Sequence, residues 1–325
     1  MGPEPTFPIF KEWLDKGYNA EMEFLKNYQD KRENPAGLME GAKQALIFGL
    51  NYYQGDKLNA ALQGSGRIAQ YARLRDYHKS LKKRGDSIIQ ELQKLCPDLK
   101  ARVMVDSAPL LERALANRTN RGFIGKNTLF IHPDKGSMFL LSEILLDHVV
   151  LEADTKIPVD GTKRTEAGGC GSCRRCQVFC PTGALDEAYT LDARKCLAYW
   201  TIEHRGVIPE KFWPWVRTYL FGCDLCQLAC PYNRTHALSK EDVVLKAAEV
   251  DPFEIACMTQ EYYVATFGGT PVTRAKRSGL RRNGLIALAV LEDPRLEEAI
   301  ATVMPEDESV LHETILQIRA RALSL

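Results

Sequence analysis

The chain has 325 residues, of which 45% are hydrophobic and 26% charged, and its formal net charge is +1 at pH 7. This length allows two or three domains with a real core, and the composition is that of an ordinary soluble globular protein. No apolar run approaches eighteen residues and no basic segment precedes an apolar one at the start, so we expect neither a membrane span nor a signal peptide.

Without a signal peptide we expect a cytoplasmic protein, in which cysteine clusters bind metal more often than they form disulfides. Because the net charge is close to zero, any contact with nucleic acid must come from a local basic patch.

Residues 1–160 are predicted to form an α/β unit. Residues 42–53, AKQALIFGLNYY, hold an apolar run suited to a buried strand. Apolar residues recur at spacings of three and four over residues 68–95, with arginines and lysines between them. This spacing predicts one amphipathic helix with a basic outer face.

The second part of this unit contains short elements. Residues 101–106 predict a strand that ends at Asp106, and SAPLLERALANR predicts a helix with Pro109 in its first turn. Residues 127–147 predict two strands joined by a turn at 133–136.

Residues 161–235 contain two cysteine motifs. The first has the spacing C-x2-C-x2-C-x3-C-P, which in bacterial two-cluster ferredoxins holds [4Fe–4S] clusters, with its last cysteine on the other cluster. The second motif lacks a first cysteine because position 220 is Leu220, and Cys196 is the only cysteine between the motifs. We therefore expect Cys170, Cys173, Cys176 and Cys230 on one cluster, and Cys180, Cys196, Cys223 and Cys226 on the other.

Zinc and a disulfide framework are the alternatives. Zinc sites with four thiolates use two C-x2-C pairs and need neither the third cysteine nor the repeated C-P. Two clusters that exchange ligands lie close together and form a short path for single electrons. Cys96 and Cys257 remain, each in an apolar helical context, and we expect both to be buried small hydrophobic residues.

Residues 236–325 are predicted to be helical. Two amphipathic helices, at 281–291 and 307–323, are separated by a link that contains proline, as in one HEAT-type repeat or in any helical hairpin. Residues 265–291 contain no acidic residue. Their five cations attract phosphate backbones, or form a solvated face; they are Arg274, Lys276, Arg277, Arg281 and Arg282.

Several strings occur in one order along nearly the whole chain: RDYHKSLKKR, VDSAPLLERALANR, GFIGKNTLFI, GSMFLLSEILLD, the first cysteine motif, YWTIEHRG, GCDLCQLACPYN and RRNGLIALA. Together they resemble the epoxyqueuosine reductase family, which uses cobalamin and completes queuosine in tRNA. The family implies a cobalamin-binding domain over 1–160, a ferredoxin-type domain with two [4Fe–4S] clusters over 161–235, and a HEAT-like helical module over 236–325.

The resemblance also implies the reaction and the partners. The substrate is tRNA with epoxyqueuosine at the wobble position of the anticodon, and the epoxide oxygen leaves as water after transfer of two electrons and two protons. An unidentified low-potential electron donor is expected to supply the electrons. Nothing in the sequence suggests an obligate assembly, so we expect a monomer. The family's extra N-terminal helix and strand are expected to be absent or altered here, and the helical module to be shorter.

Site residues follow from the resemblance by position. Asp106 matches the proposed proton donor, and its alternative role is an N-cap for the next helix. The implied cobalamin contacts are Arg32, Ala69, Asp106, Phe130, Leu141, Ala198 and Asp224. Core packing is the alternative for Phe130 and Leu141. His204 and Arg205 are implied tRNA contacts beside the five cations.

Two other functions stay open at this stage. A related corrinoid reductase of small molecules, such as a reductive dehalogenase, would share both cofactors, and the basic stretch argues against it. A simple electron carrier would leave the first 160 residues unexplained.

Overall fold

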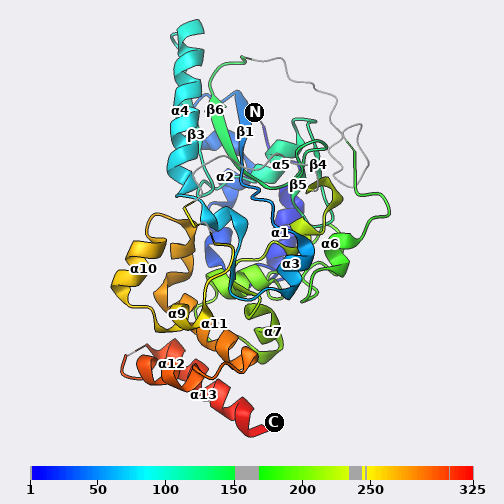
Figure 1. Cartoon of the computed structure of the whole chain (residues 1–325). Coiled ribbons are helices and arrows are strands. Elements are labelled where there is room, and N and C mark those ends of the chain that lie inside the picture. Colours follow the sequence, from blue (N-terminus) through cyan, green and yellow to red (C-terminus); the bar gives the residue numbers. More distant parts are fainter. Residues whose placement is uncertain (1, 151–167, 234–243, 246, 307, 325) are drawn as a thin grey trace.

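The computed structural model describes residues 2–150, 168–233, 244–245, 247–306 and 308–324 (Figure 1). The expected domain boundaries at 160/161 and 235/236 lie outside the described residues. Helical segments and short sheets are both present. None of the helices in the described ranges is long and apolar enough to cross a membrane.

An antiparallel sheet forms the centre of the first half of the chain. Its strands are β1 (Gln44–Asn51), β6 (Phe139–Leu146) and β3 (Ala101–Met104), in the order β1-β6-β3. Gln44 and Ala101 both lie opposite Leu146, on the two sides of β6. Because the neighbouring strands are antiparallel, this unit is the α+β form of the expected α/β region.

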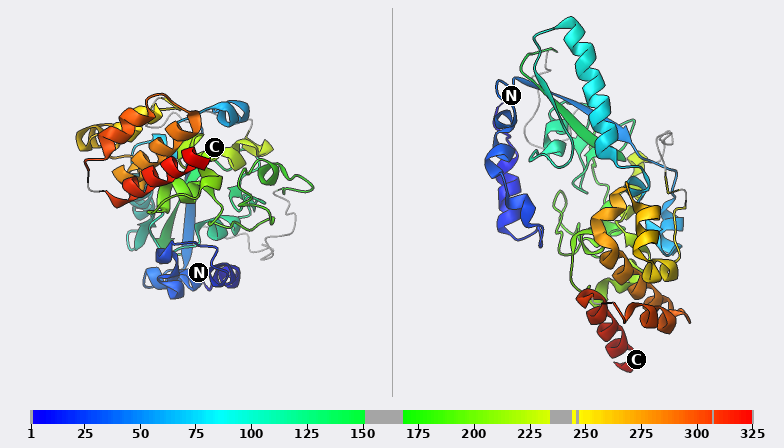
Figure 2. Two further views of the ribbon diagram at one scale, coloured as in Figure 1. Left: turned by 90° about the horizontal axis from the view of Figure 1, so that it is seen from below. Right: turned by 90° about the vertical axis from the view of Figure 1, so that its left-hand side faces the viewer.

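Side chains of β6 alternate between two covered faces. Ile144 and Leu146 pack against α4 (Tyr77–Leu95), whereas Leu145 packs toward α5 (Glu112–Asn117). The N-terminal helices lie on the side of the sheet opposite α4 (Figure 2). Each fully buried Leu or Ile contributes about 1.5–3 kcal/mol to folding. Because apolar side chains cover both faces of β6, the sheet is held firmly in place and forms a wall of the cleft described below.

The smaller elements of this half connect the sheet to the rest of the molecule. They are α1 (Phe7–Asp15), η1 (Glu23–Lys26), α2 (Gln29–Glu33), η2 (Pro35–Leu38), α3 (Leu58–Gln63), β2 (Arg67–Ile68), η3 (Gln70–Arg73), β4 (Phe123–Ile124) and β5 (Phe130–Ile131).

The prediction of a single helix over 68–95 was wrong for its first third, residues 68–76. The helix begins at Tyr77 because Asp76 caps it, accepting a hydrogen bond from the His78 backbone N–H. Before the cap, β2 pairs in parallel with β7 (Tyr219–Phe221), and Arg73 is buried and bonded to Asp56. The apolar spacing therefore came from two different elements.

Two other predictions of local structure need correction. The helix after Asp106 begins only at Glu112, so Pro109 lies in the preceding loop. The turn at 133–136 is present, with the His132 N–H donating to Gly136 O, but β5 pairs with β4 and not with β6.

The cysteine-rich region has little regular structure, as expected for loops organised by a metal cluster. Its elements are α6 (Arg175–Val178), η4 (Tyr199–Glu203), η5 (Glu210–Phe212), α7 (Trp213–Val216), β7, α8 (Leu225–Leu228) and η6 (Pro231–Asn233).

Helices follow to the C-terminal end: α9 (Pro252–Cys257), α10 (Gln260–Phe267), η7 (Pro271–Ala275), α11 (Lys276–Leu291), α12 (Leu296–Val303) and α13 (Ser309–Ser324). The helix predicted at 281–291 is not amphipathic, because every residue from Gly279 to Leu288 is buried. It packs against α7, α9 and α13. A Cβ at Gly284 would lie 2.8 Å from the Pro252 carbonyl oxygen, so glycine permits the close approach of α9. The link that contains proline also holds α12 (Figure 1).

Candidate active site

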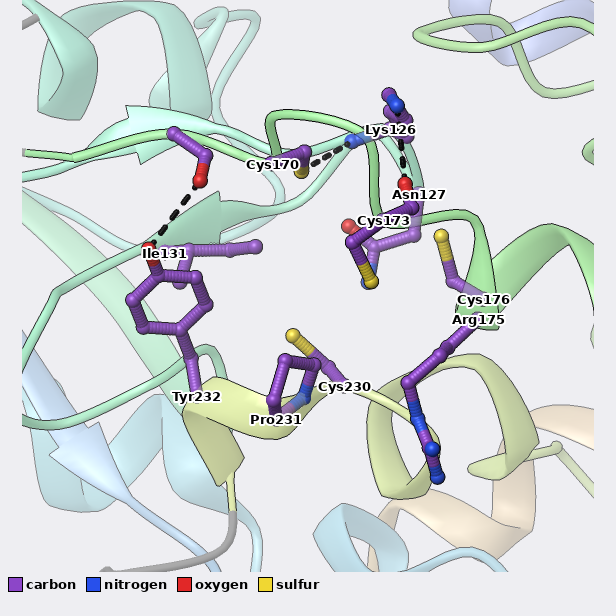
Figure 3. Close-up of a pocket in the computed structure, with 11 residues that line it drawn as sticks. Lys126, Asn127, Ile131, Cys170, Cys173, Arg175, Cys176, Cys230, Pro231 and Tyr232 are labelled. Atoms are coloured by element: carbon purple, nitrogen blue, oxygen red, sulfur yellow. Dashed lines mark hydrogen bonds between the residues drawn. The ribbon is translucent and has the colours of Figure 1, made fainter. Parts of the chain in front are cut away.

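Four cysteines from two distant segments surround one cavity of about 370 Å³. They are Cys170, Cys173, Cys176 and Cys230, and Figure 3 shows their sulfur atoms pointing into the same space. Cys176 lies in α6, and Cys230 follows α8. The first three cysteines of the first motif thus lie with the last cysteine of the second.

Polar contacts hold the loops around this cavity. The Cys170 sulfur accepts a hydrogen bond from the Lys126 backbone N–H at 3.3 Å, and the Lys126 ammonium donates to the Gly171 and Cys173 carbonyls at 2.8 and 2.9 Å. The Arg175 Nε donates to the Ala229 carbonyl at 2.8 Å. These bonds fix both cysteine segments relative to the β4–β5 hairpin.

The other four cysteines, each half-buried, form a second group. Burial raises the pKa of the Cys226 thiol well above its usual range, and smaller effects in the same direction come from Cys223, Cys196, Cys180 and Cys176, in that order. The same neighbours, Cys196 and Cys180, raise the pKa of Cys223 beside the larger effect of burial. Cys180, Cys196, Cys223 and Cys226 therefore lie close enough to interact.

The donor set fits iron–sulfur clusters. Among the residues that the structure describes, no three His, Cys, Asp or Glu side chains converge in the manner that a single metal ion requires. A cubane takes one thiolate at each of four separate irons, so its ligands surround a volume and do not meet at a point. The four thiols that line the cavity surround a volume in this way, as the ligands of a cubane do.

A buried carboxyl connects the second cysteine group to the other half of the chain. Asp224 lies between Cys223 and Cys226 and accepts a hydrogen bond from the Gln70 backbone N–H at 2.9 Å. Burial raises the pKa of Asp224 to about 6. Tyr71, the residue after Gln70, packs against Phe221 with ring centroids 6.2 Å apart.

Tyr71 also lines a large cleft of about 1470 Å³. The walls of this cleft come from α1, the start of α4, the loop after β3, α5, η4 and η7, and they include Arg32, Asp106 and Arg274. The cleft thus reaches from the sheet to the C-terminal helices, with Tyr71 and Ile202 on the side of the second cysteine group.

Asp106 projects into this cleft from a strained backbone. Its φ is +46°, in the left-handed region that few residues other than glycine adopt. The Tyr77 hydroxyl donates to Asp106 Oδ2 at 2.6 Å, and His78 Nε2 lies 3.2 Å from the same oxygen. The hydrogen bond from His78 is the main reason why the pKa of Asp106 is lowered.

Asp106 is not the N-cap of the next helix. Its own backbone N–H donates to Glu112 Oε1 at 2.9 Å, and α5 begins at Glu112 after Leu111. The alternative role considered for Asp106 was therefore wrong, and the carboxylate is left to the cleft.

Two further acids lie behind Asp106. Burial and then the charge of Asp106 raise the pKa of Glu112 to about 7. Glu143 in β6 is fully buried, and neither carboxyl oxygen has a hydrogen-bond partner among the residues that the structure describes. Burial, together with Glu112 and Asp106, raises the pKa of Glu143 well above its usual range. Burial in this wall therefore favours the neutral form of both Glu112 and Glu143.

The structure divides the five cations predicted to contact tRNA. Arg274 and Lys276 are exposed and line the cleft. Arg281 and Arg282 are 0% and 1% exposed, so their prediction as tRNA contacts was wrong.

The missing counter-charges come from outside the basic stretch. Arg277 donates to Glu306 and Glu308, at 2.5 and 2.7 Å, and Arg281 donates to Glu306 at 2.6 Å. Arg274 pairs with Glu203 at 2.8 Å. The expected absence of counter-charges was therefore wrong for these three arginines.

The two implied tRNA contacts next to η4 take part in internal bonds. His204 has its Nδ1 2.9 Å from Glu21 Oε2 and its Nε2 2.9 Å from the Val207 carbonyl. Arg205 is exposed, and its guanidinium donates to the backbone carbonyls of Arg274 and Ala275 at 2.9 and 3.1 Å. The bonds from Arg205 join the end of η4 to η7.

Of the seven implied cobalamin contacts, Arg32 and Asp106 line the cleft. The other five, Ala69, Phe130, Leu141, Ala198 and Asp224, are not among its lining residues in the described part of the chain. Ala69 and Asp224 are buried at the junction with the second cysteine group. Phe130 packs edge-on against Phe139 in the sheet region, with ring centroids 6.0 Å apart.

Tyr77, His78, Glu112 and Glu143 were not predicted as site residues. Tyr77 counted only as an apolar helix position. The signal for Glu143 was present, because one acid interrupts the apolar strand MFLLSEILL. A carboxylate inside such a strand is costly to bury unless it is paired or becomes neutral, so its presence marks the position as unusual.

Two family models match the chain. Residues 169–233 match a 4Fe-4S double cluster binding domain, and residues 32–107 match the family described as Epoxyqueuosine reductase QueG, DUF1730. The first range contains all eight cysteines considered above, and the second ends one residue after Asp106.

Curated relatives and solved structures give the same result. The epoxyqueuosine reductase of Salmonella typhimurium is 36% identical over 290 residues, covering 86% of this chain and 72% of the relative. That of Escherichia coli is 35% identical over 289 residues, covering 86% and 73%. The structure of epoxyqueuosine reductase from Streptococcus thermophilus has a TM-score of 0.84 at 26% identity, covering 98% of this chain and 83% of the other. A crystal structure of an epoxyqueuosine reductase with an epoxyqueuosine-modified tRNA-Tyr stem loop has a TM-score of 0.81 at 25% identity, covering 96% and 82%.

Proposed function

Because the chain belongs to the epoxyqueuosine reductase family, we infer that it reduces epoxyqueuosine to queuosine at the wobble position of tRNA. The enzyme is an oxidoreductase: the epoxide oxygen leaves as water, and a carbon–carbon double bond remains. The observation that carries this inference is a large cleft that holds Asp106 and borders the second of two groups of four cysteines, in a chain that matches the family over most of its length.

Each cysteine group holds one [4Fe–4S] cluster. The first cluster takes Cys170, Cys173, Cys176 and Cys230, and the shared cavity of these residues supports the assignment. The second takes Cys180, Cys196, Cys223 and Cys226, and the proximity of Cys180 and Cys196 to both Cys223 and Cys226 supports it. Each motif then contributes to both clusters, which keeps the clusters close and the electron path between them short.

The cleft is the place for cobalamin. Its volume suits a large cofactor, Arg32 and Asp106 line it, and Tyr71 lies between it and Asp224 of the second cysteine group. Cobalamin would supply the low-potential metal centre that passes electrons to the epoxide. Ala69, Phe130, Leu141 and Ala198 then support the walls of the cleft, and Asp224 does so through its bond to Gln70.

The chain's own residues supply protons and orientation. Asp106 is the general acid that neutralises the oxygen as the epoxide opens. Tyr77 fixes the Asp106 carboxyl through the hydrogen bond to Oδ2. Arg274 and Lys276, on the opposite wall, attract the phosphates of the anticodon loop.

Three larger features complete the proposal. The chain divides into a cofactor domain over 1–160, a ferredoxin-type domain over 161–235 and a HEAT-like module over 236–325. A low-potential electron donor reduces the clusters, and the enzyme acts as a monomer. The burial of α11 against α7 and α9 makes the helical module a fixed part of the cleft wall.

The test is turnover by the anaerobic protein after reconstitution with iron, sulfide and cobalamin. tRNA that carries epoxyqueuosine is incubated with a chemical reductant, and its nucleosides are separated by mass spectrometry. We expect queuosine from the wild type. No queuosine, with both cofactors bound, would contradict the proposal.

A small-molecule corrinoid reductase remains the second candidate, since the burial of Arg281 and Arg282 weakens the charge argument against it. The same assay with the free epoxyqueuosine nucleoside and with a halogenated phenol separates the two. Faster turnover of either small molecule than of the tRNA would favour the second candidate.

A further inference from the structure

His78 lies between two carboxylates on the wall of the cleft. Its Nδ1 is 2.8 Å from Asp76 Oδ1, and its Nε2 is 3.2 Å from Asp106 Oδ2. Because a carboxylate accepts hydrogen bonds, this geometry suits an imidazole ring that carries a proton on both nitrogens.

Local structure fixes this arrangement from both sides. Asp76 caps α4, which places His78 in the first turn of the helix, and the His78 ring stacks on Tyr77 with centroids 4.4 Å apart. On the other side, the strained backbone of Asp106 is tied to Glu112 through its N–H. The carboxyl and the imidazole are therefore held in register before any substrate binds.

The two carboxylates beside His78 do not affect its pKa equally. In the described part of the chain, the titratable and charged groups around His78 and Asp106 are Tyr71, Asp76, Tyr77, Glu112, Glu143 and Arg274. The hydrogen bond to Asp106 is the main reason why the pKa of His78 is raised, to about 9. At neutral pH the proton of the pair therefore lies on the ring, and Asp106 is ionised.

An ionised carboxylate cannot by itself act as the acid, and the reduction consumes two protons. We propose that His78 is the proton reservoir of the cleft, which recharges Asp106 from Nε2 so that this one carboxyl delivers both protons. This step rests on the proposed function.

The proton balance is complete. Two C–O bonds of the epoxide break, one C=C π bond forms, two electrons come from the cofactor, and the oxygen leaves as water with two protons. Each proton passes from His78 Nε2 to Asp106 Oδ2 and then to the oxygen. The His78 side chain is 42% exposed, so water recharges it between transfers. His78 thus acts through Asp106 and does not touch the substrate.

The first test needs no turnover. The full chain is labelled with ¹³C-histidine, purified anaerobically with its cofactors, and titrated by NMR, with His78→Gln used to assign the signal. We expect a His78 midpoint near pH 9, and we expect Asp106→Asn to lower it by about one to three pH units. A midpoint near the ordinary histidine value in the wild type would overturn the proposal.

The second test is the pH profile of kcat at saturating tRNA. We expect His78→Gln to bind both clusters as the wild type does, to lose about a hundredfold in kcat at neutral pH, and to lose the fall in rate above pH 9. Unchanged kcat with an unchanged alkaline limb would overturn the proposal.

His148→Gln is the matched control. His148 also lies against an aspartate, with Nδ1 2.7 Å from Asp147, and its side chain is 42% exposed, as that of His78 is. It lies after β6 and is not among the residues that line the cleft. We expect no change in kcat or in the profile.

The proposed function and the role of His78 would be contradicted by different results. A wild type that does not turn over the tRNA contradicts the proposed function, while the NMR midpoint still decides whether the His78–Asp106 pair holds the proton. An active wild type with an unaffected His78→Gln variant contradicts only the proton reservoir.

Discussion

Replacing Arg282 by methionine tests whether this arginine is structural. Its Nη1 donates to the carbonyls of His204 and Gly206 at 2.9 and 2.6 Å, and its Nη2 donates to the carbonyl of Trp200 at 2.8 Å. The side chain is 1% exposed, and burial lowers the pKa of Arg282 to about 9. The arginine thus joins α11 to the segment that follows Cys196.

The cost follows from these three carbonyls. Each carbonyl loses a partner in a partly buried site, at about 1–3 kcal/mol each, or about 3–9 kcal/mol together. Relief of the buried charge offsets part of this loss, so we expect a net destabilisation of about 3–5 kcal/mol. A chain of 325 residues has an unfolding entropy of about 0.7 kcal/mol/K, so this loss lowers the thermal midpoint by about 4–7 °C.

The assay is thermal unfolding of the anaerobic protein, followed by circular dichroism, with iron content measured beforehand. Arg205→Met is the matched control because Arg205 also donates to three backbone carbonyls but is exposed. Water replaces its bonds, so its midpoint should fall by less than about 2 °C. An Arg282→Met variant as stable as Arg205→Met, with weaker tRNA binding, would refute the structural role.

The remaining predictions concern the cysteines and the cleft. Asp106→Asn keeps both clusters and lowers kcat by about 10²- to 10⁴-fold, measured as queuosine formed per enzyme; a smaller loss would deny Asp106 the role of acid. Cys196→Ser lowers the iron content and alters one cluster, seen by electron paramagnetic resonance, whereas Cys257→Ser, outside both groups, leaves iron unchanged; equal iron in the two variants would contradict the assignment of Cys196. Arg274→Ala together with Lys276→Ala weakens tRNA binding most at low salt and leaves cluster spectra unchanged, measured by filter binding at two salt concentrations; a salt dependence equal to that of the wild type would remove this surface from the tRNA site.

The cysteine groups could be predicted because their chemistry is local. The spacing of Cys170, Cys173 and Cys176 on one loop limits what they bind, and counting cysteines leaves Cys196 for the second group. The structure then brings Cys230 to the first three across 54 residues of chain, as the ferredoxin pattern requires. The strands at 44–51 and 101–104 were also predictable from their apolar runs.

Features that depend on tertiary contacts could not be predicted. The start of α4 depends on the cap by Asp76 and on the pairing of β2 with β7, which lies 150 residues further along the chain. The basic stretch looked unpaired because Glu306 and Glu308, the partners of Arg277, lie outside it. Local charge counts do not reveal such partners.

His78 shows the same limit at the site itself. The string DYHK places a histidine beside a helix start, but nothing in the sequence says that Asp106, 28 residues later, lies against its ring. The antiparallel order β1-β6-β3 brings the end of β3 beside the first turn of α4, and this creates the pair.

The most direct measurement is the conversion of the tRNA by the reconstituted enzyme with one electron source and both cofactors quantified. We predict that anaerobic protein holding two [4Fe–4S] clusters and one cobalamin removes one oxygen atom from epoxyqueuosine in tRNA, and that protein without cobalamin does not. Protein that holds zinc in the cysteine groups and takes up no cobalamin, or loaded protein that leaves the epoxide intact, would contradict it.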